Sequence, residues 1–212
     1  MQRHAIPDID LRTRLAERGL ECHLLLRAEG KTPYDFSHEL CLQVKDLLKA
    51  AYDRDVTEAH LEYETWAVLI GPSSGPPVAC ATLSFTGTVI SCFLTRFEAV
   101  HPSVQRTGLG RLLYDCLAMW TRFLAFNDVL VQESVANFEG QYFLVSYVDA
   151  DPAEEADEED SWDAGEDNVQ GHGAFLRKLG FIRAQHDFGQ NEDEIAFQRE
   201  FHVPVQEPRE ES

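Results

Sequence analysis

The residues from Glu98 to Arg111, which read EAVHPSVQRTGLGR, combine types that could bind an anion. Gly108 and Gly110 stand at the start of an amphipathic run, and Pro102 interrupts the apolar strand pattern before them. The first N–H groups of a helix have no partner within it and carry its positive dipole end, and glycine lets a ligand approach that backbone. This segment therefore predicts a turn that binds an anion, typically a phosphate.

Other phosphate-binding motifs fit this turn poorly. A Walker A loop requires GxxxxGK followed by Ser or Thr, and a dinucleotide-binding turn requires a third glycine and a distal acidic residue. The segment has neither pattern. A glycine-rich helix start that binds nothing stays open as an alternative, because so short a motif also occurs without a ligand.

Hydrophobic periodicity predicts the elements that position this turn. Helices are expected over residues 8–18, 37–52 and 107–126, with a short one ending at residue 179. Strands are expected over residues 20–27, 65–70, 78–85, 89–100, 142–148, 181–188 and 195–201. The alternation of these elements predicts an α/β fold with a mixed sheet.

The charge of the chain excludes some classes of partner. The 212 residues carry 37 acidic and 18 basic side chains, a formal net charge of −19. Nucleic-acid binders normally have the opposite sign, so no direct nucleic-acid partner is expected. No apolar run approaches the roughly 20 residues that cross a bilayer, and residues 1–10 contain no apolar stretch. We therefore expect no membrane partner and a cytoplasmic or nuclear location.

One domain with decorations accounts for this length. We expect a leader over residues 1–19, the domain over residues 20–203 and a flexible tail over residues 204–212. An acidic insertion at about residues 149–170 interrupts the domain, because eleven residues between 149 and 167 are acidic while ordinary patterning returns on both sides. Such a block repels itself and is expected to stay mobile.

Cysteine and histidine do not form a metal-binding pattern. The five cysteines are widely spaced within apolar segments and are expected to be reduced core thiols. The eight histidines form no HExxH pair and no Cys/His cluster at ligand spacing. We therefore predict no metal.

The glycine turn resembles the signature of the GCN5-related N-acetyltransferase superfamily. The family motif Q/R-x-x-G-x-G/A is matched by Gln105-Arg106-Thr107-Gly108-Leu109-Gly110, which follows a strand ending in V-x-P. Residues 174–181, AFLRKLGF, are similar to the late helix of the family and its F-Y-E-K-L-G-F ending. The resemblance covers roughly residues 20–200. It implies a mixed sheet, partly splayed between two parallel strands and flanked by helices.

The same resemblance implies acetyl-CoA as the cosubstrate, lying between splayed strands 89–100 and 142–148 with its pyrophosphate on the motif turn. Backbone groups would hold the pantetheine arm and the thioester carbonyl, and the guanidinium groups of Arg106 and Arg111 match phosphate oxygens. The residues implied to contact acetyl-CoA are Glu98, Ala99, Val100, Gln105, Arg106, Thr107, Gly108, Leu109, Gly110 and Arg111.

The reaction implied is direct acetyl transfer from acetyl-CoA to a primary amine in a ternary complex. An alkylammonium group has a pKa of about 10.4, so a base must remove its proton. Glu98 is the candidate base, and Tyr147 and His172 are candidate acids for the departing thiolate. Each also has a structural interpretation, as a backbone contact for Glu98 and as a packed or surface residue for the other two. A covalent route through Cys92 or Cys116 is disfavoured, because neither has an activating partner in the sequence.

The sequence also departs from the family pattern. Leu176 stands where the family commonly has the acidic Tyr, and Val169 stands where it has Asn, with Asn168 one residue too early. Arg96 and Leu94 occupy the positions where some members carry a base. A non-catalytic acyl-CoA-binding module, or an acidic module that binds basic proteins, is therefore the alternative function.

The acceptor is not specified by the cofactor half of the site, which is compatible with protein lysines, N-termini, polyamines, aminoglycosides and arylalkylamines. The resemblance implies that the connection carrying the acidic insertion borders the acceptor site. Its carboxylates would concentrate cationic acceptors, so a basic protein or a polyamine is the favoured partner. A solvated loop of no consequence is the alternative.

Overall fold

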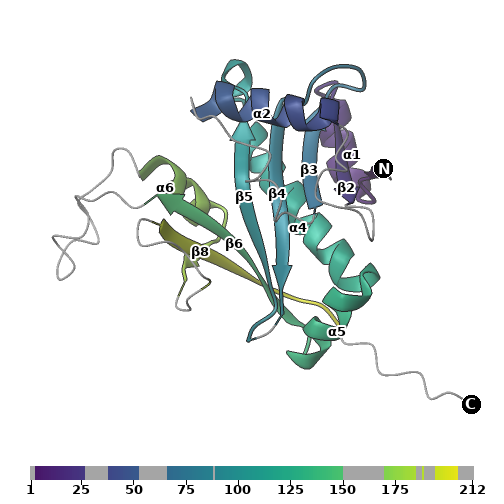
Figure 1. Ribbon diagram of the computed structural model, residues 1–212, viewed down its shortest axis with the longest axis vertical. Coiled ribbons are helices and arrows are strands. Elements are labelled where there is room, and N and C mark those ends of the chain that lie inside the picture. The colour runs from purple at the N-terminus through teal and green to yellow at the C-terminus, as the bar shows by residue number, and fades with distance from the viewer. Residues whose placement is uncertain are drawn as a thin grey trace, which may run out of the picture.

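The computed structural model describes residues 3–26, 38–52, 66–87, 89–149, 170–184, 188 and 194–204. The strands of these ranges form one sheet in the order β1-β2-β3-β4-β5-β6-β8-β7 (Figure 1). They are β1 (Arg3–Ala5), β2 (Glu21–Leu26), β3 (Trp66–Gly71), β4 (Ala79–Thr86), β5 (Cys92–Val100), β6 (Gln141–Asp149), β7 (Ile182–Arg183) and β8 (Glu194–His202). Among these neighbours, β5 and β6 run parallel and the others antiparallel.

Helices cover both faces of the sheet. They are α1 (Ile9–Ala16), α2 (His38–Tyr52), α4 (Leu109–Asn127), α5 (Val129–Asn137) and α6 (Gln170–Lys178), with a 3-10 helix η2 (Pro102–Val104). In Figure 1, α2 crosses in front of β3, β4 and β5 and α4 runs behind them. Leu47 and Leu48 of α2 pack on Leu69 and Ala99, while Leu15 of α1 belongs to the core that α4 shares. The fold is therefore a sheet between two helical layers.

The helix α4 supplies the centre of the main core. Its buried side chains recur at the helical period, and Trp120 and Leu117 are fully buried. Burying a side chain of this size stabilises a fold by about 1.5–3 kcal/mol relative to its exposed state. This stripe fixes the rotation of α4 about its own axis, and with it the direction of every other side chain on the helix.

The expected α/β class with a mixed sheet is confirmed. The structure adds β1 and α5, which the periodicity did not predict, and the strand expected over residues 181–188 is reduced to the two residues of β7. In the described ranges no helix is long and apolar enough to cross a bilayer. Residues 150–169 and 205–212, and with them nearly all of the acidic insertion and the tail, lie outside the described residues.

Candidate active site

The parallel strands β5 and β6 pair over only four residues before they separate. Their register runs from Cys92 opposite Phe143 to Thr95 opposite Ser146. β5 then continues to Val100 and β6 to Asp149 without further pairing between the two described strands. Figure 1 shows them diverging. The sheet is thus partly splayed, as expected, and the last paired residues lie where the opening begins.

A β-bulge in β5 lies beside this opening. The register between β4 and β5 shifts between Cys80 and Thr82 of β4, so that Phe97 and Glu98 of β5 share one position opposite β4. Phe97 has a φ of 51°, a left-handed backbone conformation that residues other than Gly and Asn seldom adopt. Bulges redirect the side chains that follow them. The strained residue therefore lies directly before the carboxylate.

The bulge brings Thr95 and Glu98 to the same face of the sheet. In a regular strand, residues three apart point to opposite faces because side chains alternate with a period of two. With the extra residue, Thr95 Oγ1 donates a 2.8 Å hydrogen bond to Oε1 of Glu98. The carboxylate thus faces α4, inside the splayed strands.

Glu98 is the centre of a hydrogen-bond network drawn from four elements. Its Oε1 also accepts hydrogen bonds from Ser146 Oγ of β6, at 2.7 Å, and from the Tyr114 hydroxyl of α4, at 3.0 Å. The Tyr114 hydroxyl lies 2.9 Å from Ser146 Oγ and 3.2 Å from Nε2 of His172 on α6. One tyrosine hydroxyl therefore links a carboxylate on β5 to an imidazole on α6.

The buried members of this network are its hydroxyls. Thr95 and Ser146 are fully buried and Tyr114 is 4% exposed, whereas Glu98 and His172 are partly exposed. The two ionisable groups thus lie at the accessible ends of a buried hydroxyl link. Such an arrangement can hold or pass a proton between two partly exposed groups.

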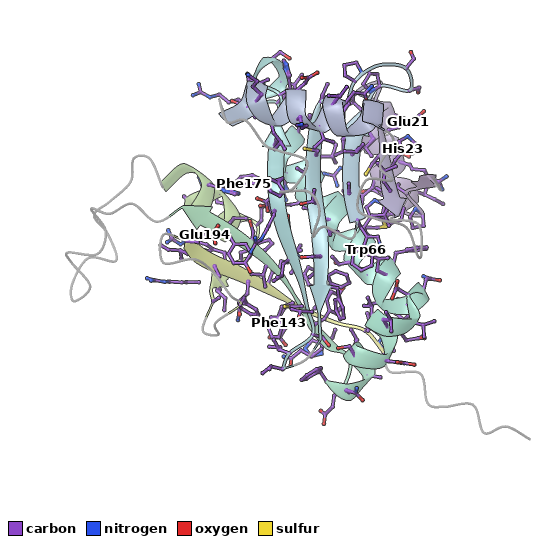
Figure 2. All side chains as sticks on the ribbon, viewed as in Figure 1. Glu21, His23, Trp66, Phe143, Phe175 and Glu194 are labelled. Atoms are coloured by element: carbon purple, nitrogen blue, oxygen red, sulfur yellow. The ribbon has the colours of Figure 1, made fainter. Side chains whose placement is uncertain are left out.

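Aromatic packing fixes the ring of Tyr114. Its centroid lies 5.6 Å from that of Phe181 and 5.7 Å from that of Phe175, both edge to face, and 6.5 Å from that of His172. Phe175 is labelled in Figure 2, at the end of the sheet where α6 lies. The position of the hydroxyl therefore depends on packing as well as on its hydrogen bonds.

The glycine turn has the geometry of an anion site. Gly108 is the N-cap of α4 with a φ of 83°, and within the described chain no side chain caps this helix end. Among the described residues, a Cβ at Gly108 would meet Arg18 Nη2 alone, at 3.7 Å. A helix start without a side-chain cap leaves its first N–H groups able to bind an anion such as a pyrophosphate.

Gly110 lies against helix α6. A Cβ there would lie 3.4 Å from Cζ of Phe175, so the position is in contact with α6. The sequence motif predicted that both glycines admit a ligand. The structure shows a left-handed φ at Gly108 and places Gly110 beside Phe175 of α6, the helix that carries His172, and the approach of a ligand to the two glycines stays a prediction.

Arg18 joins the turn and was not predicted. It lies just after α1, and its Nη1 donates a 2.9 Å hydrogen bond to the carbonyl oxygen of Thr107. The guanidinium is exposed beside Gly108. Arg106, which has a φ of 62°, and Arg111 are also exposed. The contact joins residues 89 positions apart in the chain, so no local pattern could have indicated it.

Two polar side chains of the turn donate hydrogen bonds to nearby backbone carbonyls. Gln105 Nε2 donates to the carbonyl of Val100 at 3.1 Å, and Thr107 Oγ1 donates to the carbonyl of Val104 at 2.7 Å. Both are predicted cofactor contacts that also have these structural partners. Leu109 is buried in the core, where it anchors the first turn of α4.

Tyr147 does not join the network. Successive residues of β6 point to opposite faces of the sheet. Ser146 faces α4, so the next residue, Tyr147, packs against the core on the opposite face. Its hydroxyl donates a 3.0 Å hydrogen bond to the carbonyl of Phe188, and burial raises its pKa to about 12. Leu176, at the position of the family's tyrosine, is fully buried. Of the two candidate acids, only His172 is linked to Glu98, through the Tyr114 hydroxyl.

The cysteines do not offer a nucleophile. Burial raises the pKa of the Cys92 thiol to about 12. A hydrogen bond with Cys22, and then burial, raises the pKa of Cys116 well above its ordinary value. Neither forms a thiolate at neutral pH. Among the described residues, His, Cys, Asp and Glu side chains form no group suited to holding a metal ion.

Solved structures similar to this chain include three that are named as N-acetyltransferases or N-acyltransferases. The ribosomal-protein-S18-alanine N-acetyltransferase of Escherichia coli is 17% identical, with 90% of this chain and 98% of that chain covered at a TM-score of 0.42. An acyl-CoA N-acyltransferase of Pseudomonas aeruginosa is 12% identical, with 85% and 99% covered at 0.48. An aminoglycoside 6'-N-acetyltransferase complexed with coenzyme A is 13% identical, with 87% and 99% covered at 0.48.

No protein-family model matches the sequence, and no curated protein matches it. Because the three identities do not exceed 17% and the three TM-scores do not exceed 0.48, the function proposed below rests on this chain's own residues.

Proposed function

We propose that the chain is an N-acetyltransferase that moves an acetyl group from acetyl-CoA to a primary amine by direct attack in a ternary complex. The observation that carries this proposal is the Glu98, Ser146, Tyr114 and His172 network at the point where β5 and β6 separate. The same helix, α4, presents its uncapped N-terminus at Gly108. Tyr114 follows Gly108 by six residues, or about 9 Å along the helix.

The turn supplies the binding half of the site. Two phosphates would accept hydrogen bonds from the first N–H groups of α4, with Arg18, Arg106 and Arg111 as cations around them. These three exposed guanidinium groups form a locally positive region on a chain with a net charge of −19. Backbone groups of Glu98, Ala99 and Val100, on the splayed end of β5, would hold the pantetheine arm.

The network supplies the proton-handling half. The amine nitrogen attacks the carbonyl carbon of the thioester, a C–N bond forms, and the C–S bond breaks with its electron pair going to the CoA thiolate. The ammonium must lose one proton before attack and the nitrogen a second one as the amide forms, and the thiolate must gain one. Glu98 and His172 are the partly exposed groups that can exchange those protons with a substrate, and burial of the hydroxyls excludes water between them.

A cationic acceptor, such as a lysine-rich protein segment or a polyamine, is proposed from charge. The connection between β6 and α6 carries the acidic insertion, and both of these elements contribute to the network. A negative field at this position would concentrate cations.

The decisive experiment is amine-dependent release of free CoA from acetyl-CoA, measured with a panel of amines. The proposal predicts release that requires an amine and that falls sharply in His172→Gln. The alternative, a non-catalytic acyl-CoA-binding module, is favoured by the burial of Leu176 at the family's acid position. Calorimetric binding of acetyl-CoA without amine-dependent turnover would establish that alternative and overturn the proposal.

A further inference from the structure

The protons of the network can be counted. An ionised carboxylate only accepts, and each hydroxyl has a single proton to donate. Thr95, Ser146 and Tyr114 each donate to Oε1 of Glu98, at 2.8, 2.7 and 3.0 Å. All three hydroxyl protons are thereby used. The 2.9 Å contact between Tyr114 and Ser146 is then a contact of two oxygens that share one acceptor.

This assignment of protons decides which group donates in the contact between His172 and Tyr114. Their 3.2 Å contact joins the tyrosine oxygen to Nε2 of His172. If the tyrosine proton is assigned to the carboxylate, as the charged acceptor within its reach, the contact is a hydrogen bond only when Nε2 carries a proton and donates it to the tyrosine oxygen. The neutral imidazole is then the Nε2–H tautomer, and its lone pair is on Nδ1.

We propose that Tyr114 is a positioning residue that holds His172 as the Nε2–H tautomer, so that Nδ1 of His172 removes the proton of the acceptor amine. This inference rests on the proposed acetyl transfer. The ammonium proton moves to Nδ1, the freed amine attacks the thioester, and the imidazolium then gives that proton to the departing thiolate. The second proton, which the nitrogen loses as it becomes an amide, goes to solvent. His172 therefore serves as both base and acid and ends the cycle neutral.

Glu98 supports this step from behind Tyr114. The Nε2–H group of the imidazolium faces a tyrosine oxygen whose own proton is directed to a carboxylate, so the new positive charge lies at the end of a chain that terminates in a negative one. Oε1 already accepts three hydroxyl groups. We assign the proton of the amine to His172, with Glu98 as the anchor, and the Glu98→Gln comparison below tests this assignment.

The test uses Tyr114→Phe in the full chain. The ring, which Phe175 and Phe181 hold, is kept, and only the hydroxyl is lost. Nitrogen-15 NMR at mildly alkaline pH, with the His172 signals assigned by His172→Gln, reports which nitrogen carries the proton. We expect the Nε2–H tautomer in the wild type and a mixture in Tyr114→Phe, with kcat lower by roughly 10- to 100-fold and the KM for acetyl-CoA unchanged.

Tyr142→Phe is the matched control, because Tyr142 is also a buried tyrosine, packed on Phe93 and Phe201 outside the network. It should leave both the tautomer and kcat unchanged. A second comparison separates the roles of the two ionisable groups. Glu98→Gln should keep more than about a tenth of kcat if Glu98 is an anchor, and His172→Ala should regain activity with added imidazole.

An Nδ1–H tautomer in the wild type, or the same tautomer in Tyr114→Phe, would overturn the proposal. So would Glu98→Gln losing as much activity as His172→Ala while imidazole restores nothing, because Glu98 would then be the base. The tautomer needs no acetyl-CoA to be measured. Failure of the wild type to acetylate any amine would therefore refute the proposed function, whereas a wrong tautomer in an active enzyme would refute only the role of Tyr114.

Discussion

The hydroxyl of Tyr114 donates a 3.0 Å hydrogen bond to Oε1 of Glu98, which joins α4 to β5 where β5 leaves β6. Two features make this contact. The apolar stripe of α4 fixes the direction of Tyr114, and the bulge at Phe97 turns Glu98 to the same side. A strained backbone conformation directly before a partly exposed carboxylate is typical of active sites and ligand-binding sites.

The first prediction concerns the three donors of Glu98. Thr95→Val keeps the shape of a fully buried side chain and removes one hydroxyl, so the free energy of unfolding should fall by about 1 kcal/mol. Two donors still hold the carboxylate, so kcat should fall less than in Tyr114→Phe. Urea titration and steady-state kinetics measure both effects. Thr121→Val, which removes an equally buried hydroxyl that donates to a carbonyl of its own helix, is the control and should change kcat little.

The parts of this site that the sequence indicated are those with a local cause. The glycine turn, the long helix behind it and the strand before it each depend on spacing within about 20 residues, and each was predicted. Glu98 and His172 were also predicted as candidates, because ionisable side chains at element ends are visible in the sequence. The role of each in a shared network was not visible.

The remaining members could not be predicted because they meet through tertiary structure. Tyr114 and Ser146 are 32 residues apart, and each belongs to a pattern of core residues. The slip at Phe97 decides which face Glu98 occupies, yet phenylalanine gives no sign of a left-handed residue. Helix α5 was missed although a local signal was present, since Asp128, at the end of α4, also caps α5 by accepting a hydrogen bond from the N–H of Val131.

The second prediction separates the two glycines of the turn. Gly108→Ala forces an L side chain into a φ of 83° and should cost about 1–2 kcal/mol of stability, although space for the methyl group exists. Gly110→Ala places its Cβ in ordinary contact with Phe175 and adds helix propensity, so stability should hold or rise by up to about 1 kcal/mol. Thermal unfolding compares them. A larger loss for Gly110→Ala would mean that α6 packs more closely on the turn than the structure shows.

The third prediction concerns Arg18, whose guanidinium lies at the turn with one hydrogen bond to Thr107. Arg18→Ala should weaken acetyl-CoA binding by roughly three- to tenfold, because a charge-assisted phosphate contact is worth about 1 kcal/mol at an exposed site. The loss should shrink at high salt. Calorimetry at two ionic strengths gives the answer. Arg12→Ala, on exposed α1, is the matched control, and equal losses for both variants would refute a specific role for Arg18.

The fourth prediction is a pH dependence of stability. Burial raises the pKa of the Cys92 thiol from 9.0 to about 12, so between these values the folded state holds a proton that the unfolded state has lost. The free energy of unfolding should therefore fall as the pH rises from about 9 toward 12, by at most about 1.4 kcal/mol per pH unit for this group. Cys92→Ala should show a shallower decline in chemical unfolding from pH 8 to about 11. Parallel curves would mean that the thiol is not protected from ionisation.

The last prediction concerns the acceptor. Ser146 lies three residues before the end of β6 and His172 two residues after the start of α6, so the acidic insertion is attached at both ends to elements of the network. Its carboxylates would raise the local concentration of cations there, and more strongly at low salt. Deleting residues 152–166 should lower kcat/KM severalfold for a polycationic amine, remove much of its salt dependence, and hardly change a weakly charged amine. Urea titration of the deletion variant confirms that it folds. Equal effects on both amines, or no effect on either, would show that the insertion does not select the acceptor.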